Sequence, residues 1–333
     1  MRAVVTGGAG FIGSHIVDAL TRDGAEVLVL DDLSSGREEN LAGAGGVDLV
    51  QADVRDAAAV GRAMNGFRPE LVFHLAAQID VRRSMADPAH DAAVNVLGSV
   101  NVFSAAAEAG VRRVVNTSTG GAIYGETDVV PTPETEPARP LSAYGLSKRT
   151  AETYGLWFRQ ARDLDVVTLR YGNVYGPRQD PHGDAGVIAI FCDHALNGSR
   201  PVVYGSGEQT RDYVFVGDIV AANLAASTAR LSFPLFNVGT GVEVSVLELL
   251  DAVAEAAGVD RAAVAPEHRP ARAGEVRRSC LDVARARSEL ALSSPTPLAQ
   301  GLRRTLEWMA GGAGSPRAEG GLAPASVSRT RPA

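Results

Sequence analysis

The sequence has little cysteine and no apolar run long enough to cross a bilayer. Its two cysteines, Cys192 and Cys280, lie far apart and outside any Cys-x-x-Cys motif, which argues against a disulfide framework or a zinc site. We therefore expect no metal and a reducing compartment, the cytoplasm. Because Met1 to Thr6 lead directly into an expected core strand, we also expect no signal peptide.

The chain has fewer basic than acidic residues, 32 against 39, which gives a formal net charge of -7. This balance argues against a general affinity for nucleic acid or an anionic membrane. The chain has 333 residues, of which 45% are hydrophobic, so it can bury the core of one large or two smaller domains.

Lysine is the scarcest basic residue, because Lys148 is the only one among 32 lysines and arginines. Arginine is no equivalent, being a planar fork of much higher pKa. Tyr144 lies four residues earlier, a spacing that puts both side chains on one face of a helix. A nearby ammonium favours the phenolate and lowers the phenol pKa from its usual value near ~10. Taken alone the pattern also fits a chance pair on an exposed helix; the lone lysine favours a tuned acid/base.

The N-terminus has a strand, a glycine turn and a helix in succession. Valine-rich residues 2–6 precede Gly7, Gly10 and Gly13, and an amphipathic stretch then runs to about residue 23. These glycines allow a tight turn and close backbone approach to a pyrophosphate, which would sit on the helix N-terminus. A second apolar run, 26–30, ends in Asp31 and Asp32, whose carboxylates suit a ribose diol and would repel a 2′-phosphate. NAD is therefore favoured over NADP.

Strands and helices continue to alternate through the first half of the chain. We expect further strands at 48–52, 71–75, 112–116 and 166–170, and helices at 56–65, at 89–109 and around Tyr144. This alternation predicts an α/β fold, a Rossmann-type doubly wound parallel sheet. Asp31, Asp53, Ala77 and Ser118 are all expected just after strand ends, and so along the edge where such sheets bind ligands.

Beyond residue 171 the regular alternation stops. We expect helices at 185–197, from a cap at Ser245 to 257, and at 296–310, with a short strand at 236–238. These indicate a smaller C-terminal α/β substrate-binding domain. The predicted division is 1–170 mainly for NAD binding and 171–310 mainly for the substrate, with some segments interleaved. Residues 311–333 have little to bury, and we expect a disordered tail.

Taken together, several segments resemble the extended short-chain dehydrogenase/reductase family, and within it the sugar-nucleotide enzymes of the UDP-glucose 4-epimerase type. The resemblance covers roughly residues 1–310. It depends on the segments 6–15, 74–78, 118–125, 144–148, 170–178 and 210–214.

The resemblance implies NAD as cofactor and a nucleotide sugar as substrate. Tyr144, Lys148 and either Ser118 or Thr119 would be catalytic. The cofactor would be held by Gly7, Gly10, Phe11, Ile12, Gly13, Asp31, Asp32, Asp53, Val54, Leu75, Ala76, Ala77, Gln78, Asn95, Tyr144, Lys148 and Tyr171. The substrate would be held by Asn173, Val187, Tyr204, Arg211, Arg272, Glu275 and Ser279. Small Ser279 matches, by spacing from Arg272, a position where some relatives have a tyrosine, so we expect a roomy sugar pocket.

Two departures from the family pattern concern the segment after Ser118. Many relatives have a serine or threonine four residues before the tyrosine at 124, where this chain has Gly120. The hydroxyl partner of Tyr144 therefore stays open between Ser118 and Thr119. Relatives that dehydrate the sugar have an Asp-Glu pair where this chain has Gly120 and Gly121, so dehydration is disfavoured.

The resemblance thus implies epimerisation at C4 of a UDP-glucose or UDP-galactose type sugar through a transient 4-keto sugar, with NAD as a recycled oxidant. The alternatives are a related epimerase or reductase acting on a UDP-uronate, a UDP-N-acetylhexosamine or a dTDP-deoxysugar, or a non-catalytic NAD-binding regulator. We also expect a homodimer through the helices near 89–110 and 144–163, whose apolar residues include Val94, Leu97, Val100, Leu156 and Trp157.

Overall fold

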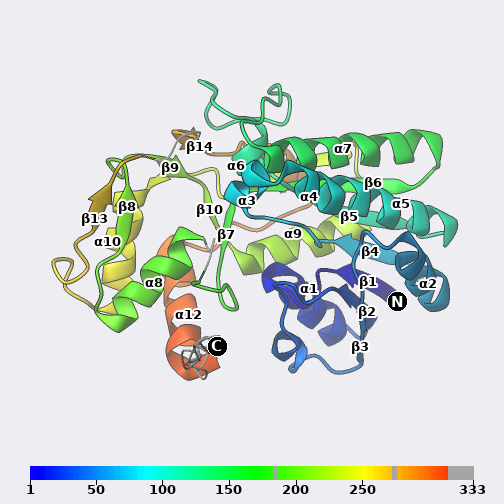
Figure 1. The fold of residues 1–333 in the computed structure, drawn as a ribbon, viewed down its shortest axis with the longest axis horizontal. Coiled ribbons are helices and arrows are strands. Elements are labelled where there is room, and N and C mark those ends of the chain that lie inside the picture. The colour runs from blue at the N-terminus through cyan, green and yellow to red at the C-terminus, as the bar shows by residue number, and fades with distance from the viewer. Residues whose placement is uncertain (183–185, 272–275, 314–333) are drawn as a thin grey trace, which may run out of the picture.

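Seven parallel strands form the central sheet of the larger of two lobes (Figure 1). The computed structural model describes residues 1–182, 186–271 and 276–313. The strand order is β11-β6-β5-β4-β1-β2-β3. The strand bounds are β1 Arg2–Thr6, β2 Glu26–Asp31, β3 Val47–Gln51, β4 Leu71–His74, β5 Arg113–Thr119, β6 Asp165–Tyr171 and β11 Leu235–Val238.

Helices cover both faces of this sheet, as the alternating pattern predicts. Alternate residues of β1 point to opposite faces, so Val5 packs in one core with Ile16, and Val4 packs in another with Val102. The first face is covered by α1 (Phe11–Arg22), α9 (Val216–Thr228) and α11 (Ala284–Glu289), and the second by α2 (Ala57–Phe67), α5 (Gly98–Glu108) and α7 (Ala143–Ala161). The Rossmann-type doubly wound sheet is confirmed.

The helix expected over 89–109 is not continuous α-helix. It consists of α4 (Pro88–Ala92), a π-helical segment η2 (Ala93–Leu97) and α5. Asn95 lies in the π-helical segment, where its side chain hydrogen-bonds the backbone of Gln78 in both directions. This polar anchoring has no counterpart in the apolar periodicity, so the sequence pattern did not reveal the wider turn.

Other elements were missed or assigned to the wrong place. The sequence analysis did not predict α3 (Val81–Ala86) or α9. The strand expected in the second domain is β11, which pairs with β6 and forms the edge of the main sheet. Ser118 was expected just after a strand but lies inside β5, which continues to Thr119. Because α9 and β11 both belong to the larger lobe, the chain crosses back into that lobe after residue 171.

The smaller lobe consists of short strands packed against helices. Its core combines residues of α8 (Val187–Asn197), α10 (Val246–Ala257) and α12 (Leu298–Trp308). Ser245 and Glu248 form a capping box at the start of α10, which confirms the expected cap. The strands are β7 Asn173–Tyr175, β8 Val202–Tyr204, β9 Thr210–Arg211, β10 Tyr213–Phe215, β12 Val244–Ser245, β13 Glu267–Arg269 and β14 Arg278–Ser279. Short helical segments elsewhere are η1 Glu38–Leu41, α6 Gly120–Ile123 and η3 Met309–Ala313.

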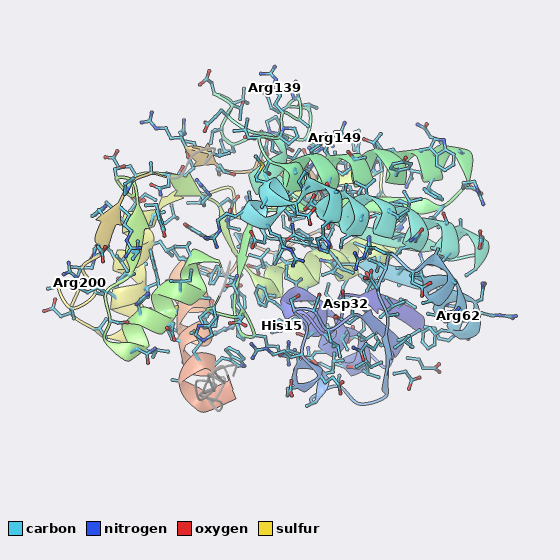
Figure 2. The ribbon with its side chains drawn as sticks, in the orientation of Figure 1. His15, Asp32, Arg62, Arg139, Arg149 and Arg200 are labelled. Carbon is cyan, nitrogen blue, oxygen red and sulfur yellow. The ribbon has the colours of Figure 1, made fainter. Side chains whose placement is uncertain are left out.

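The segment that follows β7 joins the two lobes. His15 on α1 hydrogen-bonds the Pro177 carbonyl at 2.9 Å, and Figure 2 shows this histidine between the two lobes. Two ion pairs at 2.7 Å, Arg178–Asp18 and Arg37–Asp180, tie the same segment to the N-terminal elements. Cys192 and Cys280 are free and buried. Across the described residues, no helix combines the length and apolarity needed to span a membrane.

Candidate active site

The glycine turn between β1 and α1 is packed too closely for larger residues. Gly7 has φ of +68°, and a Cβ there would lie 2.7 Å from the Ala76 backbone nitrogen. A Cβ at Gly13 would lie 2.1 Å from the Gly7 carbonyl oxygen. Gly10 is the N-cap of α1 and offers no side chain. The turn therefore presents bare backbone and a helix N-terminus, a cradle that fits a pyrophosphate.

Asp31 holds this turn in place. It is the last residue of β2 and is buried, and its carboxylate accepts hydrogen bonds at 2.9 Å from the Ala9 and Leu33 backbone nitrogens. Burial raises the pKa of Asp31. The neighbouring Asp32 is exposed and accepts from the Ser34 hydroxyl at 2.6 Å. Both carboxylates lie at the edge of the sheet where the sequence predicted them.

The remaining predicted cofactor residues line the same edge. Asp53 accepts hydrogen bonds from Arg55, which lower its pKa, and Val54 is buried against α5. Phe11 and Ile12 open α1 and are half-buried. Leu75, Ala76, Ala77 and Gln78 follow β4, and the Leu75 and Ala76 backbone nitrogens donate to the Thr6 hydroxyl at 3.2 Å.

Tyr144 and Lys148 lie in the first turns of α7, where the spacing predicted them. Tyr144 is half-buried and hydrogen-bonds the Thr119 hydroxyl. Burial raises the pKa of Tyr144 to about 12 and the charge of Asp91 raises it too, whereas the Thr119 hydrogen bond lowers it. The spacing of Tyr144 and Lys148 predicts a lowered phenol pKa, whereas in the structure burial and the charge of Asp91 raise the pKa of Tyr144.

Lys148 is buried, with 3% of its surface exposed. Burial lowers its pKa to about 8, and the charges of Glu152 and Asp91 act against that effect. Its ammonium forms no hydrogen bond or ion pair within the part of the chain that the structure describes. The same ammonium helps to keep His74 neutral, although burial is the larger reason that the pKa of His74 is lowered to about 3.

Ser118 and Thr119 differ in direction because they are neighbours in a strand. The Ser118 hydroxyl is buried and has no hydrogen-bond partner among the described residues, whereas Thr119 reaches Tyr144. The absence of a side chain at Gly120 also has a physical reason. A Cβ there would lie 2.5 Å from the Leu281 side chain, which fills that space.

Residues predicted to bind substrate meet near Gly121. A Cβ at Gly121 would lie 3.4 Å from Asn173 Oδ1, 3.9 Å from Thr119 Oγ1 and 4.0 Å from Ser279 Oγ. Strand register brings two of the predicted residues together, because Ser279 of β14 pairs with Arg211 of β9. The site therefore joins the end of β5 to three short strands of the smaller lobe.

The buried Asp212 organises these strands, although sequence analysis did not assign it a role. Its carboxylate accepts hydrogen bonds from the Thr240 and Gly241 backbone nitrogens and from the Leu281 backbone nitrogen. Its own carbonyl accepts from the Asn173 backbone nitrogen at 2.7 Å. Arg211 and Asn173 are thereby fixed relative to the segment that contains Ser279.

The structure also describes three further predicted site residues, Val187, Tyr204 and Tyr171. Tyr204 ends β8 and Val187 opens α8, and both are half-buried. The hydroxyl of Tyr171 hydrogen-bonds Asn223 on α9 at 3.0 Å, so this side chain packs between sheet and helix. Arg272 and Glu275 lie outside the described residues.

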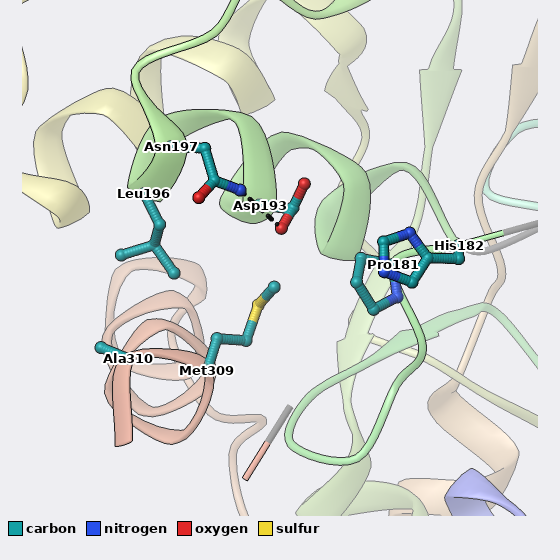
Figure 3. Close-up of a pocket in the computed structure, with 7 residues that line it drawn as sticks. All are labelled: Pro181, His182, Asp193, Leu196, Asn197, Met309 and Ala310. Carbon is teal, nitrogen blue, oxygen red and sulfur yellow. Dashed lines mark hydrogen bonds between the residues drawn. The ribbon is translucent and has the colours of Figure 1, made fainter. Parts of the chain in front are cut away.

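Two surface hollows lie away from these residues. One, of about 280 Å³, is on the outer face of α7 and is lined by Thr150, Thr153, Tyr154 and Trp157. The other, of about 290 Å³, lies between α8 and the C-terminal helix (Figure 3). Its lining residues are Pro181, His182, Asp193, Leu196, Asn197, Met309 and Ala310. Among the residues described as lining them, neither hollow contains a predicted site residue.

Comparison with known proteins agrees with this geometry. Residues 3–239 match the model of the NAD dependent epimerase/dehydratase family. The UDP-glucose 4-epimerase of Mycolicibacterium smegmatis is 49% identical over 311 residues, which cover 92% of this chain and 98% of that protein.

Solved structures give the same result. The UDP-glucose 4-epimerase of Thermotoga maritima, crystallised with UDP-glucose, has a TM-score of 0.90 and 43% identity, covering 94% of this chain and 100% of that one. The UDP-N-acetylglucosamine 4-epimerase of Methanobrevibacter ruminantium has a TM-score of 0.86 and 33% identity, covering 93% and 98%. With its glycine cradle, its paired Tyr144 and Lys148 and these relatives, the chain belongs to the NAD dependent epimerase/dehydratase family.

Proposed function

We propose that this protein is an NAD-dependent UDP-glucose 4-epimerase, which inverts C4 of UDP-glucose and UDP-galactose through a transient 4-keto sugar. The observation that best supports this proposal is that Tyr144, which hydrogen-bonds Thr119, lies one helical turn before the buried Lys148, and that Thr119, Asn173 and Ser279 meet around Gly121. The relatives named above support the choice of substrate.

In this proposal Tyr144 accepts the proton of the C4 hydroxyl and returns it after inversion. Thr119 orients the phenol by its hydrogen bond. Lys148 stabilises the phenolate electrostatically and also reaches the nicotinamide ribose. When bound, NAD would supply the reversible oxidation by which the alcohol carbon C4 can be inverted.

The cofactor would lie along the carboxyl edge of the sheet, over the glycine turn that Asp31 braces. Asp31 and Asp32 would face the adenosine ribose, with Asp53 and Val54 at the adenine and Gln78 and Asn95 toward the nicotinamide. We therefore propose a preference for NAD, and equal or tighter binding of NADP in a titration would contradict it. Residues 1–170 would serve mainly the cofactor and 171–310 mainly the substrate.

The smaller lobe would hold the nucleotide sugar. Asn173 and Arg211 would bind the diphosphate, with Arg272 on the opposite wall, because guanidinium groups pair well with phosphate oxygens. Tyr204 would stack on uracil and Glu275 would accept a ribose hydroxyl, with Val187 beside the nucleotide. Asp212 supports this arrangement by tying together the segments that contain Asn173 and Ser279.

The decisive experiment is turnover of the purified protein with a panel of UDP- and dTDP-sugars, with the products identified by NMR. Interconversion of UDP-glucose and UDP-galactose is the expected result. A C6-deoxy product would indicate dehydration. Tight NAD binding without turnover of any sugar would overturn the enzymatic proposal and favour a non-catalytic NAD-binding regulator.

The small residues Gly121 and Ser279 at this site favour a second substrate, UDP-N-acetylglucosamine. Ser279 and Gly121 face each other, and a Cβ at Gly121 would lie 4.0 Å from Ser279 Oγ. A relative of similar fold acts on that class of sugar by its name. A UDP-uronate or dTDP-deoxysugar stays an alternative that the same product panel would reveal.

We further propose a homodimer formed through α5, α7 and the π-helical segment between α4 and α5. Large apolar residues are exposed there, including Leu97 at 50% and Trp157 at 49%, next to the hollow on α7. Val94, Val100 and Leu156 are half-buried on the same helices. Light scattering that shows a monomer at micromolar concentration would contradict the dimer. The free, buried cysteines fit a cytoplasmic location.

A further inference from the structure

Asp91 is a buried carboxylate that the proposed chemistry does not use. It lies on α4 with 0% of its surface exposed. It accepts hydrogen bonds from Gln78 Nε2 at 2.9 Å, Asn95 Nδ2 at 3.1 Å and Ser147 Oγ at 2.5 Å. All three donors are neutral, so they solvate the carboxylate without cancelling its charge. A buried charge of this kind needs a counter-charge.

The candidate counter-charge is Lys148, although within the described residues no ion pair joins its ammonium to Asp91. Ser147, which donates to Asp91, is the neighbour of Lys148 in the first turns of α7. The charge of Glu152 and, to a smaller extent, that of Asp91 favour the ammonium against the effect of burial. Within the described residues Asp91 forms no ion pair with an arginine.

The other carboxylate near Lys148, that of Glu152, is already paired with arginine. Glu152 accepts from Arg170 Nε at 2.8 Å and Arg170 Nη2 at 2.6 Å, and from Arg149 Nη1 at 3.0 Å. Glu152 and Arg170 are both 2% exposed. Two guanidinium groups therefore share the charge of Glu152, although this carboxylate still favours the Lys148 ammonium more than Asp91 does.

The remaining titratable groups around the lysine provide no negative charge. Buried His74, on β4, stays neutral because its environment disfavours the imidazolium. Tyr144 is a neutral phenol until it ionises. Asp91 is thus the one carboxylate near Lys148, within the described part of the chain, that no arginine shares.

We propose that Asp91 is a positioning residue that keeps Lys148 in its ammonium form and fixes the Ser147 turn of α7 against the Gln78 loop. This inference rests on the proposed epimerase function, because it explains how Lys148 stays charged at a buried site. Asp91→Asn keeps the shape and removes the charge. The pKa of Lys148 should fall, and so should that of Tyr144, because a negative charge that opposes its ionisation is lost.

The first test is the pH profile of kcat for the holoenzyme. In Asp91→Asn both limbs should move to lower pH, by about 1 unit or more for the loss of a nearby charge. Ser147→Ala is the matched control, since it removes a hydrogen bond to Asp91 and leaves the charge in place. Its profile should stay at the wild-type position. A profile of Asp91→Asn that overlies the wild type, or an equal loss in both variants without a shift, would overturn the proposal.

Two further measurements do not depend on turnover. Ultraviolet titration of tyrosinate, with the Tyr144→Phe form of each protein subtracted, should give a lower Tyr144 pKa in Asp91→Asn than in wild type. Thermal unfolding should show coupling, so that Asp91→Asn is much less destabilising in a Lys148→Met background, where the carboxylate has lost its counter-charge. Equal destabilisation in both backgrounds would contradict the charge pairing. A wild type without epimerase activity would refute the proposed function while these two measurements still decide the role of Asp91.

Discussion

The candidate site has two sides, here called the sheet wall and the lobe wall, and they are built in different ways. On the sheet wall, Tyr144 and Lys148 project from α7, a helix of 19 residues, and Thr119 ends β5, a strand of 7 residues. On the opposite wall, Asn173, Arg211 and Ser279 lie in strands of only 3, 2 and 2 residues.

Burial follows the same division. Lys148 and Asp91 are almost fully enclosed, whereas Asn173 is exposed and Arg211 and Ser279 are half-buried. Long, well-packed elements hold reacting groups precisely, while short connected strands can vary in sequence without disturbing the sheet. We infer that the sheet wall sets the chemistry and the lobe wall selects the substrate.

Substitutions on either wall test this division between chemistry and substrate selection. Sheet-wall variants should change kcat and its pH dependence and leave nucleotide binding intact. Lobe-wall variants should change KM or substrate preference and leave the pH profile unchanged. A variant that behaves like the opposite wall would show that the division is wrong.

The largest effect is expected for Tyr144→Phe, which removes the proton acceptor and keeps the ring. Turnover should fall by at least ~10²–10⁴-fold, the range typical of acid/base groups. Binding of NAD and UDP, measured by calorimetry, should persist. Tyr154→Phe makes the same change on the outer face of α7 and should have little effect. A Tyr144→Phe enzyme nearly as fast as the wild type would refute the mechanism.

The second largest effect on turnover is expected for substitutions of Lys148. In the proposed mechanism its ammonium favours the Tyr144 phenolate, so Lys148→Met should raise the pKa of Tyr144 and shift the rising limb of the kcat profile to higher pH. Lys148→Arg keeps the charge, but a planar guanidinium has a different shape and proton affinity, and the site is only 3% exposed. We expect large losses of turnover in both. If the Lys148→Met profile lies on the wild-type one, Lys148 does not tune Tyr144.

The sheet wall was also the more predictable from sequence. The glycine turn and the Tyr144–Lys148 pair depend on short spacings, and Asp31 depends on the end of one strand; the structure shows the turn between β1 and α1, Asp31 at the end of β2 and the pair on α7. Thr119 could not be chosen over Ser118, because that choice depends on where β5 ends and which way its last side chains point.

Residues that act through packing could not be predicted at all. Asp91 and Glu152 are buried because distant segments close over them, and no local pattern shows which partner will neutralise a charge. The return of β11 to the sheet was hidden for the same reason, since strand pairing across a long crossover leaves no periodic signal.

On the lobe wall, Arg211→Ala should raise KM for UDP-glucose with a smaller change in kcat. Loss of hydrogen bonds to a charged diphosphate costs about 1.5–3 kcal/mol, or roughly 10- to 100-fold in affinity. Arg62→Ala is the matched control, because Arg62 is exposed on α2 at the far side of the larger lobe (Figure 2). A kcat loss as large as that of Tyr144→Phe, with KM unchanged, would place Arg211 among the groups that act on the reacting carbon.

The smallest expected effect concerns substrate choice at Ser279. A tyrosine there would extend toward Gly121, Thr119 and Asn173, across the space where a C2 substituent of the sugar would lie. Ser279→Tyr should therefore lower kcat/KM for UDP-N-acetylglucosamine relative to UDP-glucose by about 10-fold or more, since steric exclusion in a pocket discriminates at that level. Ser279→Ala keeps the space open and should leave the ratio near the wild-type value. Because the smaller lobe supplies this residue on a strand of two residues, the substitution should leave the Tyr144 pH profile in place. An unchanged ratio in Ser279→Tyr, or a wild type that turns over UDP-glucose but not UDP-N-acetylglucosamine, would mean that another residue limits the pocket.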